Sequence, residues 1–343
     1  MSNKLKRKAS GIILFTIIGL PIIVHAQVLE TEINSNTRQR ISINEDWRFY
    51  KYDSIEKADN LIYDARPEVE VFKDDKDADS KPTEAEQVEA KQVVLKPWIL
   101  PTGNDFIKNT AKHYVRPEGS PGKDFPFVQN NFEDNDWEVV NLPHDWAIKG
   151  PFYEGEDPEV SGGMGRLPIH GVAWYRKTIE IPGSDAGKNI FLDIDGAMSY
   201  AMVWLNGNLV GGWPYGYNSF RLNLTPFILY GGENQLAIRL DNPNHSSRWY
   251  TGGGIYRNVW LVKTNPVHVA QWGTYITTEN VSENSVKINL EVTLQNDTEN
   301  DIDVTLITKI FELNRGGERI GNAACATVAP KSPMGNCCKC WAN

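Results

Sequence analysis

Cysteine is missing from this 343-residue chain before position 325. All four cysteines lie close to the end of the sequence: Cys325, Cys337, Cys338 and Cys340. A large domain built without cysteine does not rely on disulfides, even in an oxidising compartment. The ending contains no Cys-x-x-Cys pair, and no histidine follows His268, so it does not predict a metal site. We expect neither a metal nor a cofactor.

Clusters of basic residues are also scarce. The chain has 35 Lys and Arg against 44 Asp and Glu, which gives a net charge of -9. Binding to a phosphate backbone needs a concentrated basic face. The composition therefore excludes a nucleic-acid partner.

A long apolar run is found once, at the N-terminus. Four basic residues between Lys4 and Lys8 precede the apolar stretch from Gly11 to Val24, which ends in Val-His-Ala. This pattern predicts a signal peptide over residues 1–26, cut after Ala26. The run is shorter than the ~18 to 20 residues of a spanning helix. We expect a periplasmic or secreted protein without a stable membrane anchor after cleavage.

Motifs of hydrolytic nucleophiles are missing too. The sequence has no Gly-x-Ser-x-Gly and no His-Glu-x-x-His, and the glycines at 252–254 are not followed by the Gly-Lys-Ser/Thr of a phosphate loop. His144 and Asp145 are adjacent, which directs their side chains to opposite faces of an extended chain. No catalytic residue is therefore assigned.

What the sequence does contain is a series of short strand patterns. "KNIFLDID" alternates Ile190, Leu192 and Ile194 with other residues, and "QLAIRLD" does the same around Ile238. Asn206-Gly207 lies between two apolar runs and predicts a two-residue hairpin turn. Helical patterns are rare. We expect an all-β fold, with a jelly-roll β-sandwich over residues 37–265.

An acidic stretch over about residues 68–91 interrupts this domain and has little to bury. Such a composition is typical of a solvated loop. Its "DDKDADS" segment also suggests a calcium site, but it lacks the glycine and terminal Glu of an EF-hand loop.

A second strand pattern covers residues 266–320. "SVKINLEVTLQN" places Ile288, Val292 and Leu294 on one face, as in a half-buried strand. An immunoglobulin-like sandwich takes about seven strands, and only about three are indicated here. This incompleteness and the Cys-rich tail over 321–343 lead us to expect an altered reading frame or a premature stop.

Two loops combine recognition groups for a ligand. "NLPHDWAIKGPF" contains His144, Asp145 and Trp146, and "SSRWYTGGG" contains Arg248, Trp249 and Tyr250. Aromatic faces and polar forks of this kind recognise sugars. Both loops are equally compatible with structural corners, in which Asp145 caps a turn and Arg248 pairs with a surface carboxylate.

These residues resemble the N-terminal region of glycoside hydrolase family 2, in particular its secreted β-galactosidase-like members from Bacteroidetes. The resemblance extends from Ile41 to Leu313 and rests on ordered motifs: "DWRF", "LPHDW", "WYRKTIEIP", "LNGNLVGGWPYGYNSF", "GGENQLAIRLDN" and "SRWYTGGGIYRNVWL". It implies a galactose-binding-like jelly roll followed by an incomplete immunoglobulin-like sandwich.

The resemblance also implies a division of labour. In the family, a (β/α)8 barrel carries the catalytic glutamates, and the jelly roll lends loops to the edge of its pocket. By this resemblance, Arg248 is the expected contact to a sugar hydroxyl, and the expected partner is a β-galactoside or related glycan. The isolated chain is expected to be inactive. One alternative is a free-standing carbohydrate-binding protein. Another is a member of the same family with β-glucuronidase or β-mannosidase specificity. Whether the full-length form is an oligomer stays open.

Overall fold

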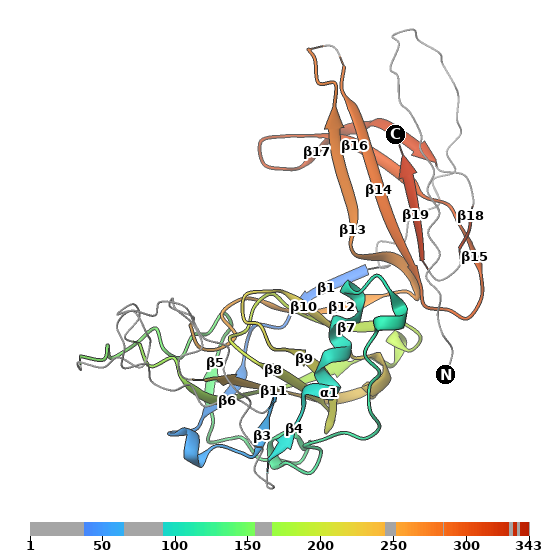
Figure 1. The fold of residues 1–343 in the computed structure, drawn as a ribbon. Coiled ribbons are helices and arrows are strands. Elements are labelled where there is room, and N and C mark those ends of the chain that lie inside the picture. The colour runs from blue at the N-terminus through green and yellow to red at the C-terminus, as the bar shows by residue number, and fades with distance from the viewer. Residues whose placement is uncertain are drawn as a thin grey trace, which may run out of the picture. The chain divides into compact units, whose positions relative to one another are not determined.

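The computed structural model describes residues 38–64, 92–154, 167–243, 252–283, 285–328, 332–334 and 337–342. The chain divides into two compact units (Figure 1). One unit is Gln39–Lys263, and the other joins Thr264–Asn343 to Met1–Arg38. The acidic stretch at 68–91 and the signal pattern at 1–26 fall outside the described residues.

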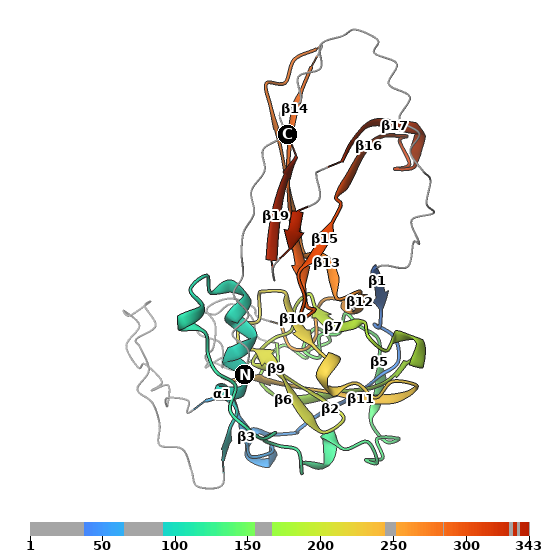
Figure 2. The same ribbon diagram turned by 90° about the vertical axis from the view of Figure 1, so that its right-hand side faces the viewer.

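The larger unit is a sandwich of two sheets, and in Figures 1 and 2 the four-stranded sheet lies above the six-stranded one. The four-stranded sheet has the order β1 (Arg38–Ser42), β12 (Val259–Thr264), β7 (Asn189–Ile194) and β10 (Phe220–Asn223). The six-stranded sheet has the order β5 (Glu138–Val140), β2 (Trp47–Lys51), β6 (Gly171–Ile181), β11 (Gly232–Asn242), β8 (Ala201–Leu205) and β9 (Asn208–Trp213).

The core between the sheets follows the alternation seen in the sequence. On β7, Ile190, Leu192 and Ile194 are fully buried and face the six-stranded sheet. On β11, alternate residues from Leu236 to Leu240 enter the same core. Burying apolar surface stabilises by roughly 25 cal/mol per Å², so this interior dominates the stability of the unit. The predicted all-β fold class is confirmed, and the only α-helix among the described residues is the short α1 (Lys96–Ile99).

The predicted hairpin joins β8 to β9. Asn206 and Gly207 form its two-residue turn, with φ values of 51° and 75°. Leu205 pairs with Asn208 across it. Asparagine and glycine adopt positive φ more readily than other residues, which is why this dipeptide marks the turn.

The outer face of the six-stranded sheet is covered by the chain between β2 and β5. This cover contains β3 (Leu61–Ile62), β4 (Val93–Val94), α1 and a series of 3-10 turns at Ile55–Lys57, Leu100–Phe106, Thr110–Lys112 and Pro126–Val128. It forms a second hydrophobic cluster against Trp174 and Trp204 of the sheet. Both faces of β6, β8 and β11 are therefore buried.

A buried ion pair lies within this covered face. The Arg239 Nε donates to Asp59 Oδ1 at 2.9 Å, and the two side chains are 1% and 0% exposed. The indole of Trp174 donates to the other Asp59 oxygen at 2.9 Å. Arg239 also reaches Asp241 at 3.2 Å. A buried charge needs such compensation, because removing one partner of a buried pair costs about 3–5 kcal/mol.

The described residues of the smaller unit form three sheets. β13 (Val267–Glu279), β14 (Lys287–Asn296) and β19 (Cys337–Ala342) form the first. β15 (Ile302–Val304) pairs with β18 (Ser332–Met334), and β16 (Ile307–Leu313) pairs with β17 (Arg319–Val328). The buried residues of its described core are Val292 and Leu294, on the face of β14 that the alternation predicts. "IDVTLITKIFEL", which reads as one strand, is divided between β15 and β16.

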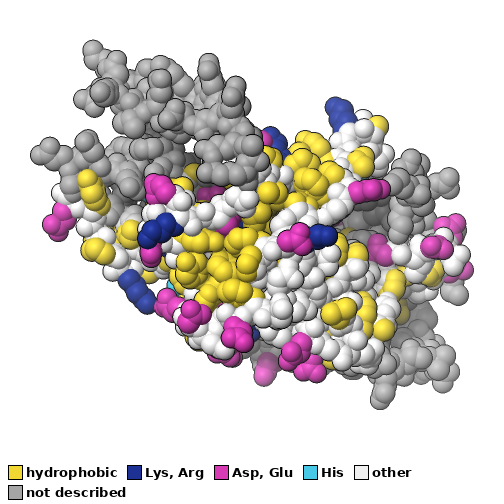
Figure 3. All heavy atoms as spheres, turned by 90° about the horizontal axis from the view of Figure 1, so that it is seen from below, with side chains coloured by type: hydrophobic (Ala, Val, Ile, Leu, Met, Phe, Trp, Pro, Cys, Tyr) yellow, Lys and Arg dark blue, Asp and Glu magenta, His cyan; other side chains and the backbone are white. Residues whose placement is uncertain are grey.

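Across the described residues, no helix has the length and hydropathy needed to cross a membrane. Figure 3 shows one face of the molecule, on which hydrophobic side chains gather at the centre and acidic ones are scattered around them. Basic side chains on this face are dispersed and form no continuous surface.

Candidate functional site

Three segments meet at one end of the sandwich, and the glycine run is in the middle. Met198 and Gly254 exchange backbone hydrogen bonds at 2.9 and 3.3 Å. From the other side, the amide of His144 donates to the Ile255 carbonyl at 2.8 Å, and that of Trp146 donates to Gly253 at 2.9 Å. The backbone at 252–255 is therefore held on both edges.

The glycines are required by close contacts. Gly254 has a φ of 122°, and a Cβ there would lie 2.5 Å from the His144 carbonyl oxygen and 2.6 Å from the Tyr175 hydroxyl. A Cβ on Gly253 would lie 2.5 Å from the Trp146 ring. Glycine is the residue that tolerates both positive φ and such approach. The run is thus a packed base and not an open phosphate cradle.

Asp145 ties the two segments together. Its Oδ1 accepts from the Ala147 amide at 2.9 Å and from the Gly253 amide at 3.1 Å. The first bond closes an Asx turn, as the structural interpretation of this loop expects. The second bond connects that turn to the glycine run.

His144 points inward. Its Nδ1 is 2.8 Å from the hydroxyl of Tyr175, and its ring meets Phe49 edge to face at 4.6 Å between centroids. Burial lowers the pKa of His144 below its ordinary value, against the opposing effect of Glu138. Burial also raises the pKa of Tyr175 well above its ordinary value. Near neutral pH both groups are uncharged and form a neutral hydrogen bond.

Trp146 completes the anchor. Its indole N–H donates to the Ile169 carbonyl at 3.2 Å, and its ring stacks on Phe49 at 6.1 Å. The Lys51 ammonium lies 5.9 Å from the ring centroid, within the range of a cation–π contact. All three residues of the first loop are only partly exposed, so the structure assigns them contacts that support the glycine run.

Arg248, Trp249 and Tyr250 lie outside the described residues, and their role in sugar binding stays a prediction. The described backbone on either side of them is held in place. Asn242 is fully buried, and its Nδ2 donates to Gly252 and to Ile169, both at 2.8 Å. His170 contacts the Pro243 carbonyl at 3.1 Å.

Sequence reasoning missed Asn242, although a signal exists. It continues the buried phase of Leu236, Ile238 and Leu240 on β11, and a polar residue in that phase needs internal partners. Sequence reasoning also missed a pair of tyrosines at this end. Tyr215 and Tyr217 are 57% and 46% exposed with ring centroids 5.3 Å apart.

The tyrosine pair belongs to the same end of the sandwich. Gly216, between the two tyrosines, accepts a hydrogen bond from the Tyr256 hydroxyl at 2.8 Å. Gly216 also packs against Met198, which bridges to Gly254. Exposed aromatic faces near a supported loop suit the C–H surface of a sugar.

Within the described parts of the chain, no three or more His, Cys, Asp or Glu residues come together as a metal would require. Asp145, a carboxylate at this end, accepts hydrogen bonds from the backbone amides of Ala147 and Gly253. The described contacts at this end hold the glycine run in place.

The family model described as "Glycosyl hydrolase 2 galactose-binding domain-like" matches residues 145–251. The match begins in the anchoring loop and runs through the segment of Arg248. The resemblance drawn from the ordered motifs is confirmed, and the family 2 domain forms part of the β-sandwich described above.

The curated relatives are glycosidases. The chain is 48% identical over 184 residues to the β-galactosidase BoGH2A of Bacteroides ovatus, which covers 53% of this chain and 21% of that protein. It is 34% identical over 175 residues to a putative β-glucuronidase of Formosa agariphila, covering 50% of this chain and 16% of that protein. The chain thus matches about a fifth of the length of these relatives.

The solved structures agree on the fold. A β-glucuronidase from glycoside hydrolase family 2 superposes with a TM-score of 0.60 at 23% identity, over 90% of this chain and 26% of the other. At this identity the similarity shows the fold and leaves specificity open.

Proposed function

We propose that the family 2 domain of this chain contributes sugar-contacting loops to an exo-β-glycosidase, with β-galactosides as the substrate class. The observation that carries the proposal is the anchored glycine run: the His144 amide donates to Ile255, the Trp146 amide donates to Gly253, and Asp145 accepts from the Gly253 amide. These contacts fix the backbone at 252–255, and this is what a loop needs if its side chains have to be held in position for a ligand. The identity to a named β-galactosidase supports the sugar.

Arg248 is the proposed contact to a sugar hydroxyl, with Trp249 and Tyr250 beside it. The exposed Tyr215 and Tyr217 extend the same end with aromatic surface. We assign the catalytic carboxylates to another domain, as the family resemblance implies. A periplasmic or secreted location, inferred from residues 1–26, is part of the proposal.

A β-glucuronidase is the second candidate. Two relatives carrying that name match 50% and 53% of this chain, and a guanidinium binds a carboxylate in a bidentate manner. Arg248 could therefore recognise the acid group of a glucuronide.

An NMR titration of the chain with methyl β-galactoside and methyl β-glucuronide tests both candidates. We expect weak binding of the galactoside at this loop, followed through the backbone amide signals of residues 252–255. These shifts should be lost in Arg248→Ala and kept in Arg315→Ala, a matched control with an exposed arginine in the other unit. Preference for the glucuronide would replace the galactosidase assignment. Equal shifts of these signals in wild type and Arg248→Ala would overturn the role of this loop.

Hydrolysis is tested separately. The isolated chain should not turn over a nitrophenyl β-galactoside. Turnover that a single substitution within the chain abolishes would contradict the assignment of catalysis to another domain.

A further inference from the structure

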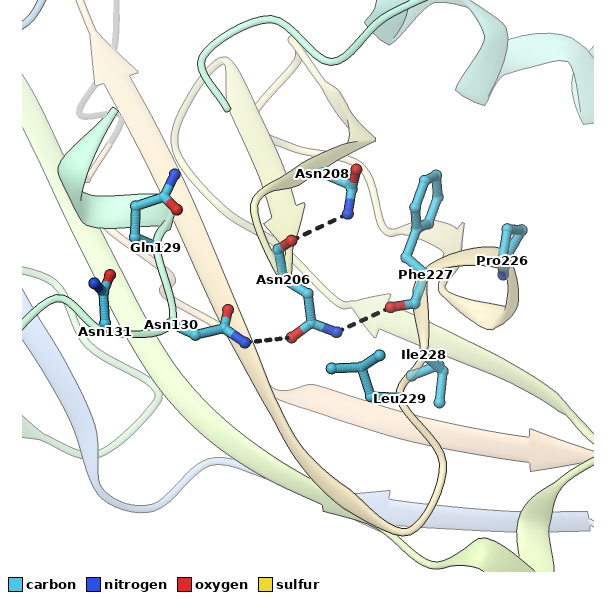
Figure 4. A pocket seen from close by; sticks show the side chains of 9 residues that line it. All are labelled: Gln129, Asn130, Asn131, Asn206, Asn208, Pro226, Phe227, Ile228 and Leu229. Atoms are coloured by element: carbon cyan, nitrogen blue, oxygen red, sulfur yellow. Dashed lines mark hydrogen bonds between the residues drawn. The ribbon is translucent and has the colours of Figure 1, made fainter. Parts of the chain in front are cut away.

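A pocket lies at the tip of the β8–β9 hairpin. It has a volume of about 620 Å³, and Figure 4 shows side chains from three loops around it. The first loop comes directly after the 3-10 turn at Pro126–Val128. The second is the turn of the hairpin itself. The third begins within the 3-10 turn at Thr225–Phe227 and continues to Leu229. The lining residues are Gln129, Asn130, Asn131, Asn206, Asn208, Pro226, Phe227, Ile228 and Leu229.

This pocket is at the opposite end of the sandwich from the glycine run. Strand β8 begins at Ala201, close to the Met198–Gly254 bridge, and ends at Leu205, next to the hairpin. Five residues of extended chain, at about 3.3 Å each, place the two ends roughly 16 Å apart. A ligand in this pocket would therefore occupy a site of its own.

The floor of the pocket is rigid. The Asn206 Nδ2 donates to the Phe227 carbonyl at 2.9 Å and to Asn234 Oδ1 at 2.8 Å, while its Oδ1 accepts from the Gln235 amide at 2.9 Å. Asn234 is fully buried and also binds the backbone N–H and C=O of Leu229 at 2.7 and 2.9 Å. One asparagine pair thus connects the hairpin to the loop that carries Phe227.

The rim has open amide groups. Among the described residues, the Asn131 side chain makes no hydrogen bond, and Asn130 and Asn208 each use only their Nδ2, toward Asn206 at 3.5 and 3.0 Å. An amide offers a donor and an acceptor side by side, as a sugar hydroxyl does. The other side of the pocket is apolar, formed by Phe227, Ile228 and Leu229 (Figure 4).

None of the described residues that line the pocket is ionisable. The Arg116 guanidinium is 6.0 Å from the Phe227 ring centroid, but it donates to the carbonyls of Val210, at 2.9 Å, and Leu209. A charged ligand would find no counter-ion there, whereas a neutral polyol matches amides on one side and apolar groups on the other.

We propose that this amide pocket is a separate binding site for an uncharged pyranose sugar. Asn130, Asn131 and Asn208 bind its hydroxyls, and Phe227 with Ile228 contacts its C–H face. Such a site would hold a glycan at the end of the domain opposite to the glycine run. The proposal stands without the proposed function, because it uses none of the residues of the glycine-run end.

The test is an NMR titration of the chain with methyl β-galactoside, following the side-chain amide signals of Asn130, Asn131 and Asn208. We expect these signals to shift in a saturable way, and to do so in Arg248→Ala as well. Asn131→Ala should weaken this binding about fivefold, the worth of roughly one hydrogen bond. Asn131 supports no other group, so this variant should fold as the wild type does.

Asn300→Ala is the matched control, since Asn300 is an exposed asparagine of the other unit, and it should bind like the wild type. The absence of saturable shifts at the three amides would overturn the proposal, as would full binding by Asn131→Ala. Equal shifts with methyl β-glucuronide would overturn the neutral ligand class. Binding lost only in Arg248→Ala would reject this pocket and leave the proposed function standing.

Discussion

The two ends of the β-sandwich are built from different chemistry. At the glycine-run end, His144, Asp145 and Trp146 direct their polar atoms to the backbone or to Tyr175. At the hairpin end, Asn206 and Asn234 fix the floor while neighbouring amides remain open to solvent. The first end is suited to positioning a loop, and the second is suited to binding a ligand directly. Substitutions at the two ends should therefore fail in different ways.

The largest effect is expected for Gly254→Ala. The new Cβ would clash with His144 and Tyr175, at a φ of 122° that alanine disfavours. Strain and overpacking together predict a loss of about 3 kcal/mol or more in the free energy of unfolding, measured by urea denaturation. The control is Gly232→Ala, where a Cβ meets nothing within 4 Å. Similar stability of the two variants would show that the glycine run is not a tight base.

At the hairpin end, Asn206→Ala should cost about 2–3 kcal/mol, because it removes the four hydrogen bonds of this side chain and leaves the Gln235 amide and the Phe227 carbonyl without their partner. Asn208→Ala removes one bond and should cost about 1 kcal/mol or less. Denaturation of both variants measures the difference. Equal costs would contradict the assignment of Asn206 to the floor.

Asp145→Ala should cost about 2 kcal/mol, since it removes the acceptor shared by the Ala147 and Gly253 amides. Asp145→Asn keeps an acceptor oxygen and should cost less. We also expect Asp145→Ala to reduce galactoside binding through Arg248 more than binding in the amide pocket. A uniform loss at both ends would mean that Asp145 supports the whole unit and not one loop.

The smallest effect is a pH dependence. Burial lowers the pKa of His144 in the folded state, so the unfolded chain binds more protons once the pH falls below the ordinary value of about 6.5. Stability from the neutral ring is present above that pH and is lost as the pH falls toward the lowered pKa. His144→Gln should flatten this part of the stability profile between pH 7.5 and 5.5. An unchanged slope would assign the dependence to other groups.

The strands with regular alternation could be predicted from the sequence, and so could the hairpin at Asn206-Gly207, because both depend on local geometry. The burial of Arg239 could not. Its position on β11 alternates with core residues and indicates solvent, yet its partner Asp59 lies 180 positions away in the chain. A segment distant in sequence covers this face of the sheet, and the local alternation of residues does not indicate it. β15 and β16 likewise separate within a stretch that reads as one strand.

The candidate site was only partly visible. His144, Asp145 and Trp146 could be selected by residue type, but type does not distinguish a ligand contact from a structural one; only the distances to Gly253 and Tyr175 do. Asn242 was not predicted as a buried residue, because a single polar residue after alternating buried positions is also typical of the end of a strand. The amide pocket joins three loops that no motif connects.

The Asp59–Arg239 pair has a practical consequence for shortening the protein. Asp59 lies in the outer cover and Arg239 in the middle of the sandwich, so a version trimmed to start after residue 59 would keep a buried guanidinium whose remaining charged contact is Asp241. The outer cover is therefore inseparable from the sandwich in expression. Truncated or grafted versions of the domain therefore have to retain Asp59 and β11 together.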